Sequence, residues 1–332
     1  MENNKINIGL VGLGYWGPNW LRNIKIHSKY SLSWISDLDK NKLSKFSQIY
    51  NLDKSSVFEK YQDALNTKIP DIVLIATPPS SHLPIGEYCI NQKVNSIIEK
   101  PMGLNIEQTK KLVDLSQQNK VSLFIDNTYI FTPVAKKIKQ IIDSGIIGDL
   151  QFIFSSRLNL GLIQKDVDVI RDLAIHDFSL LDYFLEKTPN NVHAKAVTHK
   201  PANVNSTASI DLNYENNLIV QLGLSWNSPV KVRSMIISGS KKSIYWDDTN
   251  QTEKLKLFDA SAGFDSNDPN RHISYTLGDT TSFSLENREA ISIELDHIYD
   301  VLVNNKKPLN GVDHILRVSN VLESCEKSLN NV

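Results

Sequence analysis

Short apolar runs alternate with helix-length amphipathic segments through the first 126 residues of the chain. Apolar runs of about four to eight residues bounded by polar turns indicate buried strands, and apolar positions that recur three and four residues apart indicate helices. This alternation is typical of βαβ units, in which helices cover a parallel sheet. We expect the strands at 6–11, 32–36, 72–76, 96–98 and 121–125.

Two helices carry signals at their ends. Asn105, with Gln108 three residues later, forms a capping pair ahead of the helical stretch 110–118. A second helix is expected at 133–144, and Gly145 directly after it suits the left-handed conformation that ends many helices.

Beyond Gly148 the pattern changes to successive strands and turns, which favours a mostly antiparallel sheet in an α+β domain. A helix is expected at 172–186, and the stretch 259–268, rich in Ser, Ala, Gly and Asp, predicts a surface loop. We expect strands at 151–157, 206–214, 218–225, 230–238 and 256–258, turns at 215–217 and 239–240, and later helices at 288–303 and 312–329.

The composition is that of a globular protein with a small-molecule partner. Of 332 residues, 41% are hydrophobic, which is enough for two domains with a core each. The 36 basic and 37 acidic side chains nearly cancel and form no block of like charge, so we expect neither nucleic acid nor a membrane surface as partner.

The two cysteines and the N-terminal apolar run bear on the compartment. Cys89 and Cys325 lie far apart and in no CxxC or Cys/His cluster, which argues against a disulfide framework or a structural zinc site. The run 6–13 is too short for a membrane span, and it leads into a glycine-rich turn rather than a signal cleavage site. We therefore expect a cytoplasmic protein.

The segment Gly12-Leu13-Gly14-Tyr15-Trp16-Gly17 follows the first expected strand and opens a helix. In a GxGxxG turn the first glycine permits the tight turn, the second lets the backbone approach a pyrophosphate, and the third lets helix and strand pack closely. The alternative is an ordinary glycine turn. Tyr15 and Trp16 are cofactor-binding candidates by their place in the turn, although aromatic residues in a first helical turn more often pack than bind.

Asp37 follows Gly17 by 20 residues, at the end of the second expected strand. A carboxylate there accepts hydrogen bonds from the ribose hydroxyls of a dinucleotide and repels a 2′-phosphate. The pattern therefore predicts a Rossmann domain with a doubly wound parallel sheet that binds NAD in preference to NADP. We place it at 1–126, followed by a substrate and oligomerisation domain at 127–332 whose terminal helices could pack back on the first domain.

Two further segments come at the carboxyl ends of expected strands, where doubly wound sheets bind their ligands. One runs from Ala76 to His82 with the sequence ATPPSSH, and the other is Glu99-Lys100-Pro101. From these segments we take five cofactor-binding candidates, namely Thr77, Pro78, His82, Glu99 and Lys100.

With these motifs and the segment DLAIHD from Asp172 to Asp177, nearly the whole chain resembles the Gfo/Idh/MocA family, named for glucose-fructose oxidoreductase, inositol dehydrogenase and a rhizopine-catabolism protein. The resemblance implies an oxidoreductase in which Lys100 lies beside the nicotinamide, while Asp172 and His176 reach it from the substrate domain. One departure is the helix end at Asn91-Gln92-Lys93-Val94, where the family often has glycine, so this end must close in another way.

The chemistry of these three residues agrees with the resemblance. Asp172 and His176 are four residues apart, so on a helix they share one face. Oxidising an alcohol requires a base for the hydroxyl proton, which suits His176, and a positive charge near the developing alkoxide, which suits Lys100. The alternatives are that His176 is a satisfied core histidine, that Asp172 caps its helix, and that Lys100 is a surface lysine at a strand end.

The segment Arg157-Leu158-Asn159-Leu160-Gly161, with GYWGPN from Gly14 to Asn19, resembles the branch of the family associated with bacterial surface-polysaccharide sugars. This implies a nucleotide-linked sugar or sugar acid as substrate, with Arg157 and Asn159 as substrate-binding candidates. The planar guanidinium of Arg157 suits a carboxylate or phosphate, and the alternative is a structural arginine paired with a neighbouring strand.

Three kinds of function follow from these residues. The first is a sugar dehydrogenase that transfers a hydride to NAD, the second a family member that uses NAD transiently for elimination or hydrolysis, and the third an NAD-sensing regulator without catalysis. The third is disfavoured because Lys100, Asp172 and His176 are all present. We expect no metal ligand cluster and no nucleophile elbow, and we expect a homodimer or homotetramer formed through an open sheet face.

Overall fold

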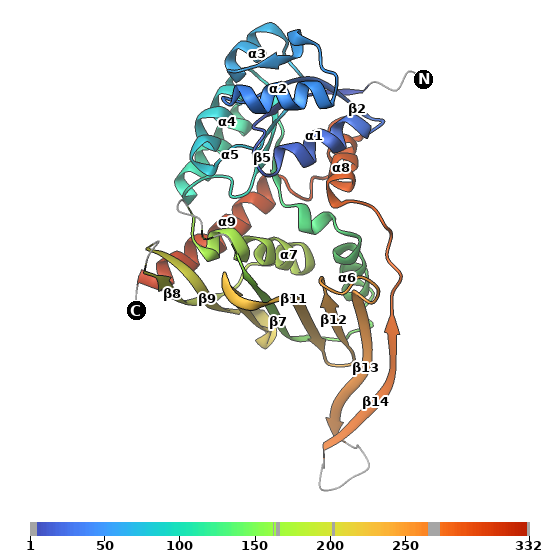
Figure 1. The fold of residues 1–332 in the computed structure, drawn as a ribbon. Helices are drawn as coiled ribbons and strands as arrows, with labels where there is room; N and C mark the ends of the chain where they lie inside the picture. The colour runs from blue at the N-terminus through green and yellow to red at the C-terminus, as the bar shows by residue number, and fades with distance from the viewer. Residues whose placement is uncertain (1–4, 162, 164–166, 201–202, 265–272, 331–332) are drawn as a thin grey trace. The chain divides into compact units, whose positions relative to one another are not determined.

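A computed structural model of the protein describes residues 5–161, 163, 167–200, 203–264 and 273–330 (Figure 1). The chain divides into two compact units, each with its own sheet. The first unit is formed by Met1–Phe131 and Arg288–Ser319, and the second by Thr132–Asn287 and Asn320–Val332.

The first unit is built on a six-stranded parallel sheet in the order β3-β2-β1-β4-β5-β6. The predicted doubly wound sheet is thereby confirmed. The strand missing from the sequence-based prediction is β3, whose two residues are too few to show a period. The strands are β1 (Ile6–Val11), β2 (Tyr30–Ser36), β3 (Val57–Phe58), β4 (Ile72–Ile75), β5 (Asn95–Glu99) and β6 (Leu123–Asp126).

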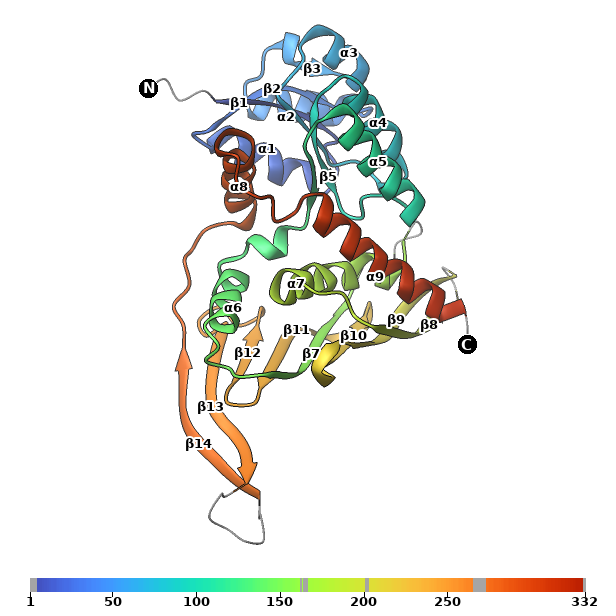
Figure 2. The ribbon, with the colours of Figure 1, turned by 180° about the vertical axis from the view of Figure 1, so that it is seen from behind.

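Helices cover both faces of this sheet, as Figures 1 and 2 show. One face packs against α1 (Gly17–Ile26), α2 (Lys40–Ile49) and α8 (Ala290–Asn304). The other packs against α3 (Tyr61–Thr67), α4 (His82–Asn91), α5 (Ile106–Asn119) and the first part of α9 (Val312–Asn330).

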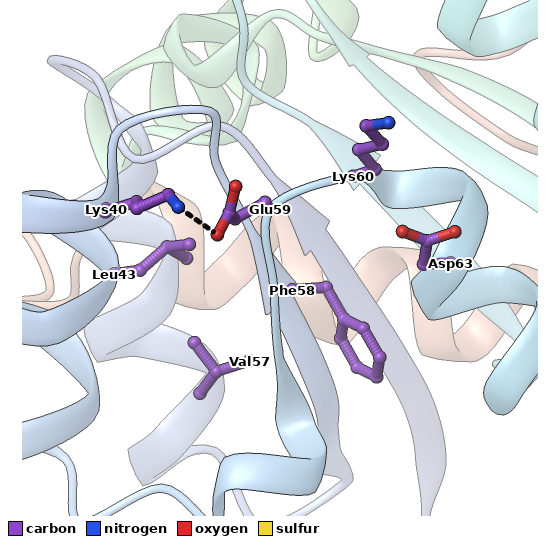
Figure 3. A pocket seen from close by; sticks show the side chains of 7 residues that line it. All are labelled: Lys40, Leu43, Val57, Phe58, Glu59, Lys60 and Asp63. Carbon is purple, nitrogen blue, oxygen red and sulfur yellow. Dashed lines mark ion pairs between the residues drawn. The ribbon is translucent and has the colours of Figure 1, made fainter.

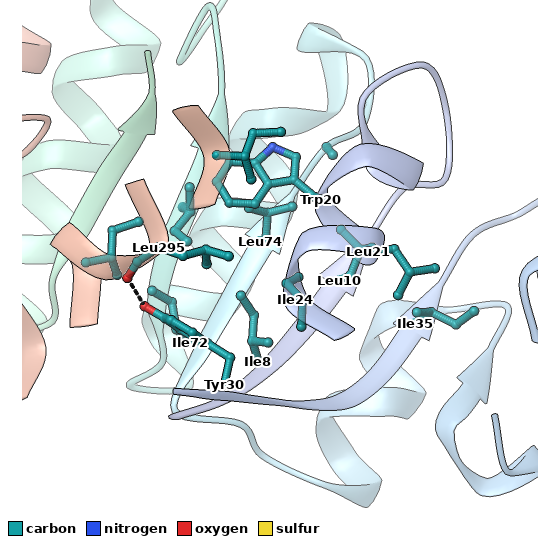
Figure 4. Packing of buried hydrophobic residues seen from close by; sticks show 14 of the residues in the cluster. Ile8, Leu10, Trp20, Leu21, Ile24, Tyr30, Ile35, Ile72, Leu74 and Leu295 are labelled. Atoms are coloured by element: carbon teal, nitrogen blue, oxygen red, sulfur yellow. Dashed lines mark hydrogen bonds between the residues drawn. The ribbon is translucent and has the colours of Figure 1, made fainter. Parts of the chain in front are cut away.

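The core on the first of these faces includes a helix from late in the sequence. Trp20 of α1 and Leu295 of α8 are fully buried with the apolar side chains of the central strands (Figure 4). The hydroxyl of Tyr30 donates a hydrogen bond of 2.7 Å to the carbonyl of Leu295. Helix α8 therefore belongs to the first core although it follows the second sheet in sequence.

The second unit contains an eight-stranded sheet in the order β14-β13-β12-β11-β7-β10-β9-β8. Its described pairs are antiparallel except β7 with β10, which confirms the prediction of a mostly antiparallel sheet. The strands are β7 (Leu150–Leu160), β8 (Asn191–His199), β9 (Val204–Asn213), β10 (Ile219–Ser225), β11 (Asn227–Gly239), β12 (Ser243–Asp247), β13 (Leu255–Phe264) and β14 (Ile273–Ser282), and α6 (Pro133–Asp143) precedes them.

Three local predictions can be compared with the structure. Gly145, after α6, has a φ of +70°, as the predicted left-handed cap requires. Asn105 accepts a hydrogen bond from the Gln108 backbone as predicted, and the Gln108 side chain accepts one from the backbone of Leu104. The predicted loop 259–268 is wrong over 259–264, which belong to β13 because that strand pairs with β14; residues 265–268 lie outside the described part.

The predicted helix at 172–186 has an irregular start. Residues Ile170–Ala174 form a π-helical turn, and α7 (Ile175–Leu185) continues from it. A π turn inside a helix often marks a functional position. Within the described ranges, no helix has the length and apolar character needed to cross a membrane.

Candidate active site

The turn between β1 and α1 is shaped by its glycines. Gly12 has a φ of +97°, and a Cβ on it would lie 2.6 Å from the carbonyl oxygen of Ala76. A Cβ on Gly17 would lie 2.1 Å from the carbonyl oxygen of Gly12. Neither position accepts a side chain. Gly14 differs, because a Cβ there would meet no described atom within 4 Å, so its backbone borders open space.

Helix α1 begins three residues after Gly14. Trp16 is the N-cap residue, and no side chain in the described chain caps the helix. Uncapped N–H groups at a helix start, beside a glycine that leaves room, form a cradle for a phosphate group. Tyr15 is 86% exposed and Trp16 is 38% exposed, so these rings lie at the surface and not in the core.

Asp37 is joined to this turn. One carboxylate oxygen accepts a hydrogen bond of 2.6 Å from the backbone N–H of Leu13, and the other accepts one of 2.8 Å from Asp39. A carboxylate offers about four lone-pair directions, so each oxygen keeps capacity for a further donor such as a ribose hydroxyl. The open backbone at Gly14, the uncapped helix and Asp37 together fit a dinucleotide.

His82 connects two loops at the same edge of the sheet. Its ring is fully buried, with Nδ1 2.8 Å from the carbonyl oxygen of Pro101 and Nε2 2.8 Å from that of Thr77. Burial lowers the pKa of His82. Both ring nitrogens lie near backbone carbonyls, and a neutral imidazole donates to one of them, so His82 lies between the Thr77 and Pro101 loops. Pro78, which follows Thr77, is exposed.

Glu99 and Lys100 end β5 in different environments. The Glu99 side chain is buried and Lys100 is half-buried. Burial, followed by the neighbouring carboxylate of Asp126, raises the pKa of Glu99 well above its usual value. The protonated form of Glu99 is thereby favoured, and Glu99 directly precedes Lys100 in the first unit.

Sequence reasoning missed the group around Asp126. Its carboxylate accepts hydrogen bonds from the Trp20 indole at 2.8 Å and the Thr128 hydroxyl at 2.6 Å. Glu294 of α8 is fully buried beside it, and burial followed by Asp126 raises the pKa of Glu294. The signal in the sequence was the place of Asp126 at the end of the strand after Glu99, but no pattern in the sequence indicated Glu294 as its neighbour.

Asp172 and His176 lie on the π turn and on the first turn of α7, and both are half-buried. A carboxylate oxygen of Asp168 accepts hydrogen bonds from the backbone N–H groups of Ile170 and Arg171, so Asp168 caps this segment. Asp172 instead accepts a hydrogen bond of 3.2 Å from the indole N–H of Trp226. The capping alternative for Asp172 therefore does not describe this segment.

Arg157 is buried and paired with the residue after His176. Its Nε donates a hydrogen bond of 2.8 Å to Asp177, which also accepts one of 2.9 Å from Ser155. This pair favours the structural alternative for Arg157, although its partner is on a helix and not on a neighbouring strand. Asn159 is half-buried, and a Cβ on Gly161 would lie 3.0 Å from its side-chain nitrogen.

Asp37 is thus hydrogen-bonded to the glycine turn, and Asp172 is hydrogen-bonded to Trp226. Lys100 belongs to the first unit, whereas Asp172 and His176 belong to the second. The described residues contain no group of His, Cys, Asp and Glu suited to a metal ion.

A shallow pocket of about 470 Å³ lies beside β3 around the ion pair of Lys40 with Glu59, but none of the predicted site residues lines it (Figure 3).

Comparison with known proteins gives matches in both units. Residues 6–127 match the model of the oxidoreductase family with an NAD-binding Rossmann fold, and residues 135–245 match that of the GFO/IDH/MocA C-terminal domain. Curated relatives include the uncharacterized oxidoreductase YrbE of Bacillus subtilis, 24% identical over 64% of this chain, and the UDP-N-acetylglucosamine 3-dehydrogenase of Acidithiobacillus ferrooxidans, 30% identical over 60% of it. These alignments span 64% and 62% of the relatives' own lengths. A solved structure of the latter enzyme superposes with a TM-score of 0.82 and 20% identity, covering 98% of both chains.

Proposed function

Because the chain belongs to the Gfo/Idh/MocA oxidoreductase family, we propose that it is an NAD-dependent dehydrogenase that oxidises one hydroxyl-bearing carbon of a sugar. The observation that carries this proposal is the glycine turn with Asp37 bound to it. Open space at Gly14, an uncapped helix and a carboxylate in one place are the features that a dinucleotide requires.

The cofactor would be held by Gly12, Gly14, Gly17 and Asp37, with Thr77 at the neighbouring strand end. Bound NAD would supply the acceptor for a hydride. We propose NAD rather than NADP because the negative charge of Asp37 would repel a 2′-phosphate. His82 and Glu99 would act as positioning residues, since one bridges two loops and the other is buried under Lys100.

Lys100, Asp172 and His176 would act on the reacting hydroxyl. His176 would accept its proton, and the ammonium group of Lys100 would stabilise the developing alkoxide. The hydrogen on the carbon then leaves with its electron pair, and the carbinol becomes a carbonyl. Asp172 would orient the substrate or the imidazole, because it lies four residues before His176 on the same helical segment.

We propose a nucleotide-linked sugar as substrate, since a relative with 30% identity is a UDP-N-acetylglucosamine 3-dehydrogenase.

We further propose a homo-oligomer formed through the face of the second sheet that carries exposed apolar side chains. Phe154 and Ile236 lie opposite each other on β7 and β11 and are 41% and 38% exposed. Light scattering at several concentrations tests this; a mass equal to one chain throughout would contradict it.

A thermal-shift screen tests the substrate class. Nucleotide sugars and free polyols are each added to the NAD-loaded protein, and the same compounds without NAD are the control. A ligand at a hundred times its Kd adds about 2.7 kcal/mol to the free energy of unfolding, which raises Tm measurably. A rise with a nucleotide sugar that exceeds the rise with the free sugar supports the proposal. No rise with any member of the panel would contradict it.

A further inference from the structure

Trp226 lies between β10 and β11, and both its backbone and its indole N–H are hydrogen-bonded. It is 2% exposed. Its backbone N–H donates a hydrogen bond of 2.9 Å to the carbonyl of Ser206, and its carbonyl accepts one of 2.9 Å from Gly161. The indole N–H donates to a carboxylate oxygen of Asp172 at 3.2 Å. A rigid donor from the sheet is thus directed at Asp172 of the DLAIHD segment.

Gly161 makes this arrangement possible. A Cβ on Gly161 would lie 2.9 Å from Cδ1 of the Trp226 ring, so the indole packs directly against the glycine backbone. Any side chain at 161 would push the ring, and with it the donor, away from its present place. Gly161 is the last residue of the RLNLG segment, which the sequence analysis connected with substrate binding.

We propose that Trp226 is a positioning residue for Asp172, and that Gly161 serves the site by letting the indole approach it. This inference rests on the proposed function as far as catalysis is concerned. A carboxylate on a helix has several side-chain rotamers, and a fixed donor selects one of them. The selected rotamer keeps Asp172 directed toward the substrate or toward His176, so the indole acts on the reaction through Asp172 alone.

The second unit offers a matched control in Trp246 of β12. This indole is 3% exposed, and within the described residues its Nε1 has no hydrogen-bond partner. Trp246→Phe therefore removes the same atoms as Trp226→Phe, from an equally buried site, without removing a bond to Asp172.

A resonance experiment tests the bond without any substrate. The five tryptophans give five indole N–H signals after ¹⁵N labelling, and Trp226→Phe identifies the one from Trp226. In Asp172→Ala this signal is expected to move and its proton to exchange faster with solvent, while the Trp246 signal stays in place. A Trp226 signal that does not respond to Asp172→Ala would overturn the proposal. Should Trp226→Phe not fold, Gly161→Ala identifies the signal, because it displaces the same ring.

A kinetic cycle tests the consequence, with NAD and the sugar of the panel that gives the fastest NADH formation. Trp226→Phe is expected to lower kcat about tenfold, as the loss of a hydrogen bond to a charged group does, with an unchanged KM for NAD. Trp246→Phe should stay within about twofold of wild type. In an Asp172→Ala background, which has no acceptor for the indole, Trp226→Phe should cost nothing further.

The outcomes separate the two proposals. Equal rates for the two Trp→Phe variants, or losses that multiply in the double variant, would overturn the positioning role. If the wild-type protein forms no NADH with any sugar of the panel, the proposed function fails, while the resonance experiment still decides whether Trp226 holds Asp172.

Discussion

At the scale of single residues, the side chains proposed for chemistry and those that support them differ in exposure. Lys100, Asp172 and His176 are half-buried, so each can reach a ligand. The residues next to two of them in sequence, Glu99 and Asp177, are buried and bonded within their own unit. The hydrogen bonds of a buried polar side chain restrain its backbone. The half-buried side chain next to it in sequence therefore starts from a restrained position.

The first prediction concerns the proposed acid–base groups. His176→Ala or Lys100→Ala should lower kcat by roughly 10² to 10⁴, because positioned acid–base and electrostatic groups typically supply that much. NAD affinity should be nearly unchanged, since the glycine turn is elsewhere. Steady-state kinetics and calorimetry measure both quantities, and His193→Ala on the exposed edge strand β8 is the control. A fully active His176→Ala, or one that only unfolds, would establish the core-histidine alternative.

The second prediction concerns the charge of Asp37. Asn at this position can still accept the hydrogen bond from Leu13, so Asp37→Asn keeps the bond to the glycine turn, while it removes the negative charge and the hydrogen bond from the Asp39 backbone. The ratio of NAD to NADP affinity should fall by about tenfold, which corresponds to about 1.4 kcal/mol. Calorimetry on protein stripped of bound cofactor measures it. An NADP preference in the wild-type protein would refute the role given to Asp37.

Sequence reasoning proposed residues for the candidate site but did not predict the partners that they contact in the structure. Asp37 and the glycines were found because a GxGxxG turn fixes its own geometry within a few residues. The sequence did not predict the contacts of His82 and Arg157, because their partners, Pro101 and Asp177, are separated from them by 19 and 20 residues. Trp226 belongs to no sequence motif, and its hydrogen bond to Asp172 joins residues 54 positions apart, so the sequence did not predict this contact.

Among the strands, those with continuous apolar runs were predictable, whereas the polar edge strands of the second sheet were not. Strand β1 is a nearly continuous apolar run with buried residues on both faces, so the pattern alone defines it. Strands β8 and β14 lie at the two edges of the second sheet and carry many polar residues. Their extended form depends on pairing with β9 and β13, which no local pattern records.

The third prediction concerns the end of α4, where the sequence departs from the family by lacking glycine. Lys93 closes this end with a φ of +63°, and its backbone N–H donates to the carbonyl of Ile90. A non-glycine residue in this conformation is strained. Lys93→Gly should therefore raise the free energy of unfolding by about 0.5–1 kcal/mol in a denaturant titration. Lys93→Ala, which keeps a Cβ, is the control, and an equal gain there would refute this explanation.

At the scale of the whole molecule, the C-terminal part of the chain completes the N-terminal unit. Helix α8 brings Glu294 beside Asp126 and Glu99, so three buried carboxyl groups meet in the first unit. The pKa values of Glu99 and Glu294 are raised above the usual 4.5. The folded state therefore binds more protons than the unfolded state above that pH.

The fourth prediction follows from this proton excess. The contribution of Glu294 to stability is fully present below about pH 4.5 and is lost as the pH rises through the folded pKa. Glu294→Gln keeps a neutral, hydrogen-bonding side chain, so it should reduce the fall in stability with pH by up to about 1.4 kcal/mol per pH unit. Tm measured from pH 5 upward checks this, with the exposed Glu107→Gln as control. An unchanged pH dependence would show that Glu294 is ionised.

The stoichiometry of NADH formation tests whether the protein is a sugar dehydrogenase. The purified protein, stripped of cofactor, is incubated with NAD and a nucleotide sugar in the presence of EDTA, and absorbance at 340 nm is compared with the carbonyl product by mass spectrometry. One NADH is expected for each keto sugar formed, with no dependence on a metal ion. Product formed without net NADH would instead identify a redox-neutral elimination or hydrolysis. NAD binding without any product would identify a sensor, and either result would contradict a sugar dehydrogenase.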